Sequence, residues 1–145
     1  MIYYTIDTST IISNKITTLP DNILFSSIVL MELMSSANDE SERRRFEILG
    51  REFQRDNSLI VPSYEDWMMF SKILYWLSQG RRQKAGGLAP KLKPGASQRM
   101  AMDVLLAVSA RRWNATVVTE NWNDFKAIQY YCKVRLAKSS EFLKL

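Results

Sequence analysis

Three carboxylates in this 145-residue chain are each the only charged side chain in an apolar stretch. They are Asp7, Glu32 and Asp103, in residues 1–14, 22–38 and 100–110 respectively. Burying one unpaired carboxylate is costly, and burying three would threaten a domain that is stabilised by about 5–15 kcal/mol in total. We therefore expect a positive charge, such as a bound cation, to offset them.

A fourth carboxylate, Asp124, follows a predicted strand at 115–119, much as Asp7 follows the first strand of the chain. In open sheets of parallel strands, the binding crevice lies beyond the carboxyl ends of the strands. The two helical acids lie on apolar helices that must pack on the sheet, so their side chains could reach that end. Glu120 is an alternative to Asp124 as the fourth carboxylate of the site, and the spacing of the residues fits either one.

The chain contains no histidine, which excludes Ser-His-Asp and Cys-His catalysis and histidine-ligated zinc. Its single cysteine, Cys132, excludes an internal disulfide and a cysteine-rich metal site. Carboxylates without histidine favour a hard cation, Mg2+ or Mn2+, whose number (one or two) stays open. Such an ion would orient and deprotonate a water molecule for phosphodiester hydrolysis.

Each acid also has a purely structural explanation. Asp7 could initiate a turn, Glu32 could extend to solvent, and Asp124 could cap a turn. Asp103 could be an acid in the first turn of its helix, where the helix dipole stabilises a negative charge. Singly these are weak signals. Their joint placement in a basic chain without histidine is what favours a site.

The elements expected to position these acids alternate between strands and helices. Strands are predicted at 2–6, 58–62, 115–119 and 132–136, and helices at 26–38, 39–57, 64–80, 99–114 and 121–128. This alternation predicts a parallel α/β sheet covered on both faces, because parallel strands need crossover connections. No linker interrupts the chain, so 1–145 is expected to form one domain.

No basic leader and no apolar run of about 18 residues is present in the sequence. Together with the lone cysteine, this predicts a cytoplasmic protein. The net charge is +5, which favours an anionic partner.

Three stretches, TIDTSTII, SSIVLMELMSS and MAMDVLLAVSARRWNATVVTENWNDF, resemble the motifs of PIN-domain ribonucleases, especially VapC-type toxins. In that family a strand ends in Asp-Thr-Asn/Ser, a helical Glu follows, and a later Asp opens a helix before Val-Thr-x-Asn-x-x-Asp-Phe. The resemblance spans most of the chain, and the last stretch is the most specific. The matching residues are Asp7, Thr8, Ser9, Glu32, Asp103, Thr119, Asn121, Asp124 and Phe125.

The resemblance implies a three-layer α/β/α PIN-like domain with a central, mostly parallel sheet. It also implies a Mg2+- or Mn2+-dependent endoribonuclease, homodimerisation, and inhibition by a small antitoxin of a type II toxin-antitoxin pair. The implied catalytic and metal-binding residues are Asp7, Glu32, Asp103 and Asp124. Thr119 and Asn121 are expected to orient these ligands, and Ser9 to bond Asp7, although Ser9 stands where the family commonly has Asn.

A basic stretch at 81–98 is predicted to be a flexible loop, because it holds three of the five glycines and two of the four prolines. It is longer and more basic than expected of a minimal toxin. The expected RNA-binding cations here and just beyond are Arg81, Arg82, Lys84, Lys91, Lys93 and Arg99, since each cation on a phosphate adds affinity. A solvated connection or an antitoxin-docking surface is the alternative.

Four aromatic residues are candidates for stacking on RNA bases, with core packing as the competing role. They are Trp113, Trp122, Tyr130 and Tyr131.

Two other functions fit less well. An inactive PIN-like RNA-binding or regulatory module is opposed by the presence of all four acids. An aspartate-nucleophile phosphatase would place Asp7 as the nucleophile, but its second Asp would fall at Ser9, whose hydroxyl cannot act as acid and base near neutral pH.

Overall fold

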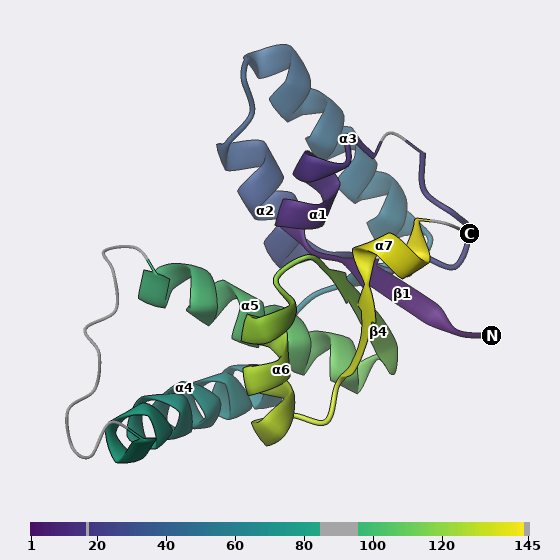
Figure 1. Ribbon diagram of the computed structural model, residues 1–145. Coiled ribbons are helices and arrows are strands. Elements are labelled where there is room, and N and C mark those ends of the chain that lie inside the picture. Colours follow the sequence, from purple (N-terminus) through teal and green to yellow (C-terminus); the bar gives the residue numbers. More distant parts are fainter. Residues whose placement is uncertain (17, 85–95, 144–145) are drawn as a thin grey trace.

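The computed structural model describes residues 1–16, 18–84 and 96–143, with side chains placed except at 79–84 and 96–99 (Figure 1). The strands are β1 (Tyr3–Ile6), β2 (Phe25–Ser26), β3 (Leu59–Ile60), β4 (Ala115–Thr119) and β5 (Arg135–Lys138). The helices are α1 (Thr8–Ser13), α2 (Ser27–Ser35), α3 (Glu40–Arg55), α4 (Tyr64–Lys84), α5 (Ala96–Arg112), α6 (Trp122–Tyr131) and α7 (Ser139–Phe142).

The strands are all parallel and form a three-stranded and a two-stranded sheet that meet at β1. The three-stranded sheet has the order β1-β4-β5, and the two-stranded sheet pairs β2 with β3. A parallel bridge between Tyr4 and Ile23 joins them, with backbone hydrogen bonds from Tyr4 to Asn22 (3.0 Å) and from Leu24 to Tyr4 (2.8 Å). The strands therefore run in the order β3-β2-β1-β4-β5.

The side on which successive strands are added changes between β1 and β4, although all the strands stay parallel. The chain leaves β1 toward β2 and β3 on one side, while β4 and β5 lie on the other. Ile6 pairs with Val118, so β1 and β4 end side by side. A crevice forms at such a switch point because the connections on its two sides depart in opposite directions.

Helices cover both faces of the sheet. On one face α5 packs against β4, α2, α4 and α6, and Figure 1 shows α4, α5 and α6 grouped below the strands, with α2 and α3 above. The buried apolar side chains form two clusters, and Val117 belongs to the larger one, which lies on this face and is called the larger core below. The next residue, Val118, packs with Ile6 and Ile23 in the smaller cluster on the other face. Alternation along a strand produces this division. It confirms the predicted layered α/β architecture.

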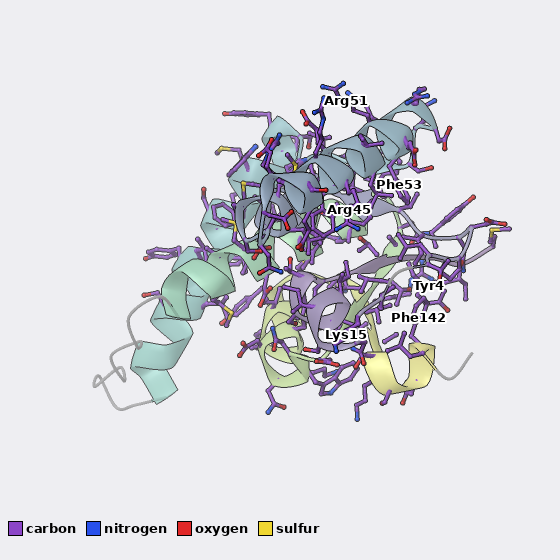
Figure 2. All side chains as sticks on the ribbon, turned by 90° about the horizontal axis from the view of Figure 1, so that it is seen from above. Tyr4, Lys15, Arg45, Arg51, Phe53 and Phe142 are labelled. Carbon is purple, nitrogen blue, oxygen red and sulfur yellow. The ribbon has the colours of Figure 1, made fainter. Side chains whose placement is uncertain are left out.

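The second face is closed by the last helix. The ring of Phe142 in α7 lies 5.0 Å from the ring of Tyr4 in β1, centroid to centroid, and Figure 2 shows the two side by side. Helix α7 also packs against β4 and β5.

Gly50 lies where α3 packs against α2. A Cβ added at Gly50, in the middle of α3, would lie 2.3 Å from the Cδ2 atom of Leu30 in α2. A glycine in a helix interior costs about 0.5–1 kcal/mol relative to alanine. Any larger side chain at this position would require the Leu30 side chain to move.

Several elements differ from the sequence-based expectation. Helix α4 continues to Lys84 instead of ending at Gly80, and α5 begins at Ala96, so the two ends of the expected 81–98 loop are helical. Residues 85–95 lie outside the described part. Elements α1, β2 and α7 were not predicted, because α1 and α7 are too short for a helical period to show, and β2 is a two-residue strand that overlaps the start of the segment predicted as a helix.

Among the described residues, no helix combines the length and the apolar character needed to cross a membrane.

Candidate carboxylate site

Asp7 lies at the switch point, directly after β1, and only 2% of its surface is exposed. Its Oδ1 atom accepts hydrogen bonds from the Thr10 backbone N–H (3.0 Å) and the Ser9 hydroxyl (3.3 Å). Its Oδ2 atom accepts a bond of 2.6 Å from the Thr119 hydroxyl. Within the described residues, no lysine or arginine forms a salt bridge with this carboxylate. The buried charge is thus stabilised by three neutral donors.

The bond to Thr10 makes Asp7 the N-cap of α1, with φ −74° and ψ 164°. A carboxylate at this position satisfies one of the free N–H groups of the first turn, typically worth about 1 kcal/mol. Asp7, which could have initiated a turn, therefore begins a helix. The same cap fixes the direction in which the Asp7 side chain points.

Glu32 approaches Asp7 from α2. Its Oε1 atom accepts a hydrogen bond of 3.0 Å from the hydroxyl of Thr8, the residue after Asp7. Burial raises the pKa of Glu32 above its ordinary value, the negative charge of Asp7 raises it further, and the bond from Thr8 opposes both effects. The Thr8 bond thus places the two carboxylates where the negative charge of each disfavours the charge of the other.

The other two predicted ligands have different surroundings. Asp103 is half-buried on α5, a helix that packs against both β4 and α2. Asp124 is exposed in the first turn of α6. Over the described residues, no group of three or more Asp, Glu or Cys side chains is close enough to hold a metal ion.

The Thr8 hydrogen bond therefore brings Glu32 beside Asp7, while the four-carboxylate metal site remains a prediction. Like charges that converge repel one another, and a cation between them removes that repulsion. The donor set still fits a hard divalent ion, since the buried acids supply oxygen ligands only.

Glu120, the alternative to Asp124, has a structural contact of its own. Its Oε1 atom accepts a bond of 2.7 Å from the Asn14 side-chain amide, at the end of α1. Its backbone N–H donates to the Thr10 hydroxyl at 3.1 Å. These bonds fasten α1 to the loop that follows β4, which favours a structural role for Glu120.

Asn121 contributes through its backbone. Its N–H donates to the Thr119 hydroxyl at 2.9 Å, and this hydroxyl in turn donates to Asp7. The Asn121 side chain is exposed and forms no capping hydrogen bond with α6.

Sequence reasoning missed the site contacts of Thr8, Thr10 and Asn14. The hydroxyl-rich stretch after β1 was the available signal for the two threonines, because hydroxyl groups there can bond a neighbouring carboxylate. Asn14 gave no such signal, because its partner is more than a hundred positions away.

The predicted RNA-binding cations cannot be placed by their side chains. Lys91 and Lys93 lie outside the described residues, as do the side chains of Arg81, Arg82, Lys84 and Arg99. The backbone assigns the first two arginines and Lys84 to the end of α4, and Arg99 to the start of α5.

The four candidate stacking aromatics differ in their surroundings. Trp113 and Tyr131 pack against the larger core, and the Tyr131 ring stacks on Trp76 at 5.8 Å between centroids. Tyr130 is 83% exposed, and Trp122 is half-buried. Core packing therefore accounts for two of them and leaves Tyr130 and Trp122 available.

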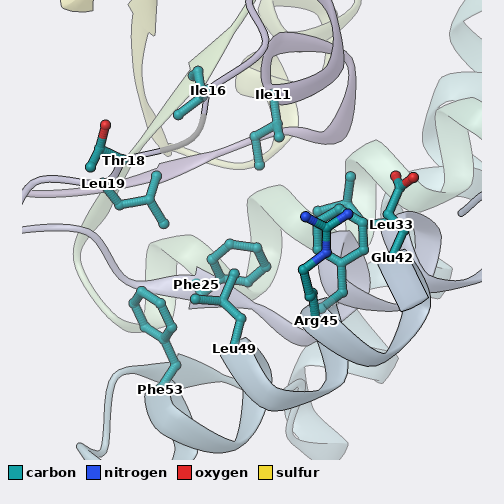
Figure 3. Close-up of a pocket in the computed structure, with 11 residues that line it drawn as sticks. Ile11, Ile16, Thr18, Leu19, Phe25, Leu33, Glu42, Arg45, Leu49 and Phe53 are labelled. Carbon is teal, nitrogen blue, oxygen red and sulfur yellow. The ribbon is translucent and has the colours of Figure 1, made fainter. Parts of the chain in front are cut away.

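A cavity of about 610 Å³ lies between α1 with its following loop and the side chains of α3 (Figure 3). Its lining is mostly apolar, and Figure 3 shows Arg45 extending from α3 toward the α1 side. The lining residues are Ile11, Ile16, Thr18, Leu19, Phe25, Leu33, Glu42, Arg45, Phe46, Leu49 and Phe53. None of the predicted ligands is among them, so the cavity is separate from the carboxylate site.

Solved structures with the same fold include three that cover nearly the whole chain. The structure of FitAB bound to the IR36 DNA fragment has a TM-score of 0.59 at 14% identity, over 94% of both chains. The DNA-bound VapBC from Salmonella typhimurium has a TM-score of 0.55 at 20% identity, over 96% of this chain and 99% of that one. VapBC2 from Rickettsia felis, bound to a fragment of its promoter, has a TM-score of 0.55 at 21% identity, over 94% and 98%.

No protein-family model matches the sequence, and no curated protein matches it. At these identities the likeness to the VapBC and FitAB structures defines the fold. The chain has the α/β fold with a parallel sheet that the resemblance to VapC-type PIN domains implied, and that prediction is confirmed.

Proposed function

We propose that this protein is a metal-dependent endoribonuclease and the toxin of a toxin-antitoxin pair. The observation that carries the proposal is the buried Asp7 carboxylate, which lies at the switch point beside Glu32 and is oriented by Thr119. The VapC-type motifs and the shared fold support the same function. RNA as the substrate and Mg2+ or Mn2+ as the cofactor follow from the family resemblance and the oxygen donors.

Asp7, Glu32, Asp103 and Asp124 would hold one or two ions. A bound ion would lower the pKa of a coordinated water molecule, which is the nucleophile, and stabilise charge on the phosphate. The protein's own contribution is orientation: Thr119 and the Thr10 backbone fix the Asp7 carboxylate, and Thr8 holds Glu32 beside it.

The proposed partner is a small antitoxin. The neighbouring structures are of the two-component assemblies VapBC and FitAB, and the apolar cavity between α1 and α3 is a surface that a partner segment would fill. Homodimerisation and a cytoplasmic location are proposed from the family resemblance and the sequence.

The decisive experiment compares Mn2+-dependent cleavage of RNA by wild type, Asp7→Asn and Asp103→Asn. Asparagine preserves the size of the side chain and removes the charge, so both variants should fold and lose cleavage. Asp21→Asn is the matched control, because Asp21 is an exposed acid between α1 and β2. Full activity in both test variants would overturn the assignment.

A second measurement separates the nuclease from an inactive RNA-binding module. Mn2+ should raise the melting temperature of wild type, because an ion that binds only the folded state stabilises it. The increase should vanish in Asp7→Asn. No increase in wild type would favour the inactive module.

A further inference from the structure

We infer that Trp122, Lys126 and Lys138 form a subsite that binds single-stranded RNA beside the carboxylate site. The inference rests on the proposed function and names where the RNA strand lies. Lys126 and Lys138 both lie over the Trp122 ring, with their Nζ atoms 5.8 and 5.1 Å from its centroid. The two lysines come from α6 and β5, so the fold brings them to one aromatic side chain.

The subsite lies at the same edge of the sheet as Asp7. Lys138 is the last residue of β5 and pairs in register with Thr119, the residue that bonds Asp7. Adjacent strands are about 4.8 Å apart, so Lys138 and the end of β1 are separated by two strand spacings, roughly 10 Å. One RNA strand is long enough to contact both.

The two lysines are not neutralised by acids. Among the described side chains, the arginines of α3 and α5 that form salt bridges pair with Glu40, Glu47 and Asp66, whereas neither lysine of the subsite forms one. Lys126 donates instead to the neutral Gln129 side chain at 2.8 Å. A contact between an exposed cation and an aromatic ring is weak, so a phosphate group can bind both lysines in its place.

The combination of two cations with an indole ring favours single-stranded RNA over other anions. Phosphates bind the lysines, and an unpaired base can stack on the half-buried Trp122 ring. A small anion would need only the charges, and a duplex would hide its bases from the ring.

The test measures binding of a fluorescein-labelled 12-nucleotide oligouridine by fluorescence anisotropy, in EDTA so that no cleavage occurs. Replacing both lysines, K126Q with K138Q, should weaken binding about 25-fold at 0.1 M salt and reduce the salt slope by about 1.4, because each phosphate contact on a single strand contributes about 0.7. The matched control is K72Q with K133Q, which removes the same charge from exposed positions away from the carboxyl ends of the strands. Equal losses in the two double variants would overturn the subsite.

Trp122→Ala tests stacking separately. It should weaken binding about 5-fold to 150-fold, the range for loss of one stacked base, and Trp122→Phe should restore most of it. Melting temperatures of both variants show whether the fold is kept. Unchanged binding by a folded Trp122→Ala would overturn the role of the ring. Selective binding without any Mn2+-dependent cleavage would instead refute the proposed nuclease and leave the subsite in place.

Discussion

The Thr119 hydroxyl donates a 2.6 Å hydrogen bond to Asp7 across 112 positions of sequence, from the end of β4 to the end of β1. The same hydroxyl accepts the Asn121 N–H. The position of the Asp7 carboxylate therefore depends on the conformation of the loop after β4, through the Thr119 hydroxyl.

Thr119→Val should destabilise the protein by about 1–3 kcal/mol, because it leaves a buried carboxylate oxygen without its donor. Thr5→Val is the matched control: Thr5 is also a buried strand threonine, but its hydroxyl has no hydrogen-bond partner among the described residues. That change should be neutral or stabilising. Urea unfolding of both variants measures the difference, and similar losses would contradict the role of the Thr119 bond.

Glu32 should make stability depend on pH. Burial, and then the charge of Asp7, raise the pKa of Glu32 in the folded state, so the folded protein holds this proton more tightly than the unfolded chain. The contribution is full below the ordinary glutamate pKa and is lost as pH rises through the raised value. In EDTA, Glu32→Gln should therefore lose less stability than wild type as pH rises from the ordinary glutamate pKa of about 4.3 through the raised value.

Thr8→Val provides the opposite test of the same group. The hydrogen bond from the Thr8 hydroxyl lowers the pKa of Glu32. Removing this bond should therefore raise that pKa further, so that the Glu32 contribution to stability is lost at a higher pH. Thermal unfolding across the pH range would show the displacement. A curve that overlays wild type would mean that the bond does not act on Glu32.

Asp124 and Glu120 can be distinguished by metal affinity. Glu120 is engaged with Asn14, whereas Asp124 is exposed in the first turn of α6. We expect Asp124→Asn to weaken Mn2+ binding, measured by calorimetry, and Glu120→Gln to leave it near the wild-type value. The reverse order would assign the fourth ligand to Glu120.

The basic segment should also contribute to RNA binding. Neutralising Arg81, Arg82, Lys84, Lys91 and Lys93 together should weaken binding and flatten its salt dependence, because fewer counterions are released. The salt slope measured by anisotropy is the readout. An unchanged slope would mean that the segment is a solvated connection or a protein-docking surface.

The layered fold was predictable because long elements carry strong patterns. The apolar run at β4 and the alternation of strands with helices indicated a parallel sheet. The short helices α1 and α7 were not predictable, because neither is long enough to show a helical period and α1 depends on contacts such as the Asp7 cap. Propensity within six residues does not determine a helix.

The site was predictable in part for the same reason. The isolation of Asp7 and Glu32 in apolar sequence pointed to two carboxylates, and in the structure Glu32 accepts a bond from the residue after Asp7. The order of contacts around them did not follow from the sequence, because Thr8, Thr10 and Thr119 act through side-chain geometry that only packing sets. The position of the Asp103 side chain relative to Asp7 depends on how α5 packs on the sheet, and no local sequence pattern determines that packing.

The fastening of α1 to β4 has a consequence for synthesis of the chain. A helix of six residues is not stable alone, and α1 is held at its start through Asp7 and Thr119 and near its end through Asn14 and Glu120. A nascent chain that has not yet released β4 from the ribosome lacks both fastenings. The part of the Asp7 orientation that comes from Thr119 therefore requires a segment that is synthesised late, whereas the bonds from Ser9 and Thr10 are local.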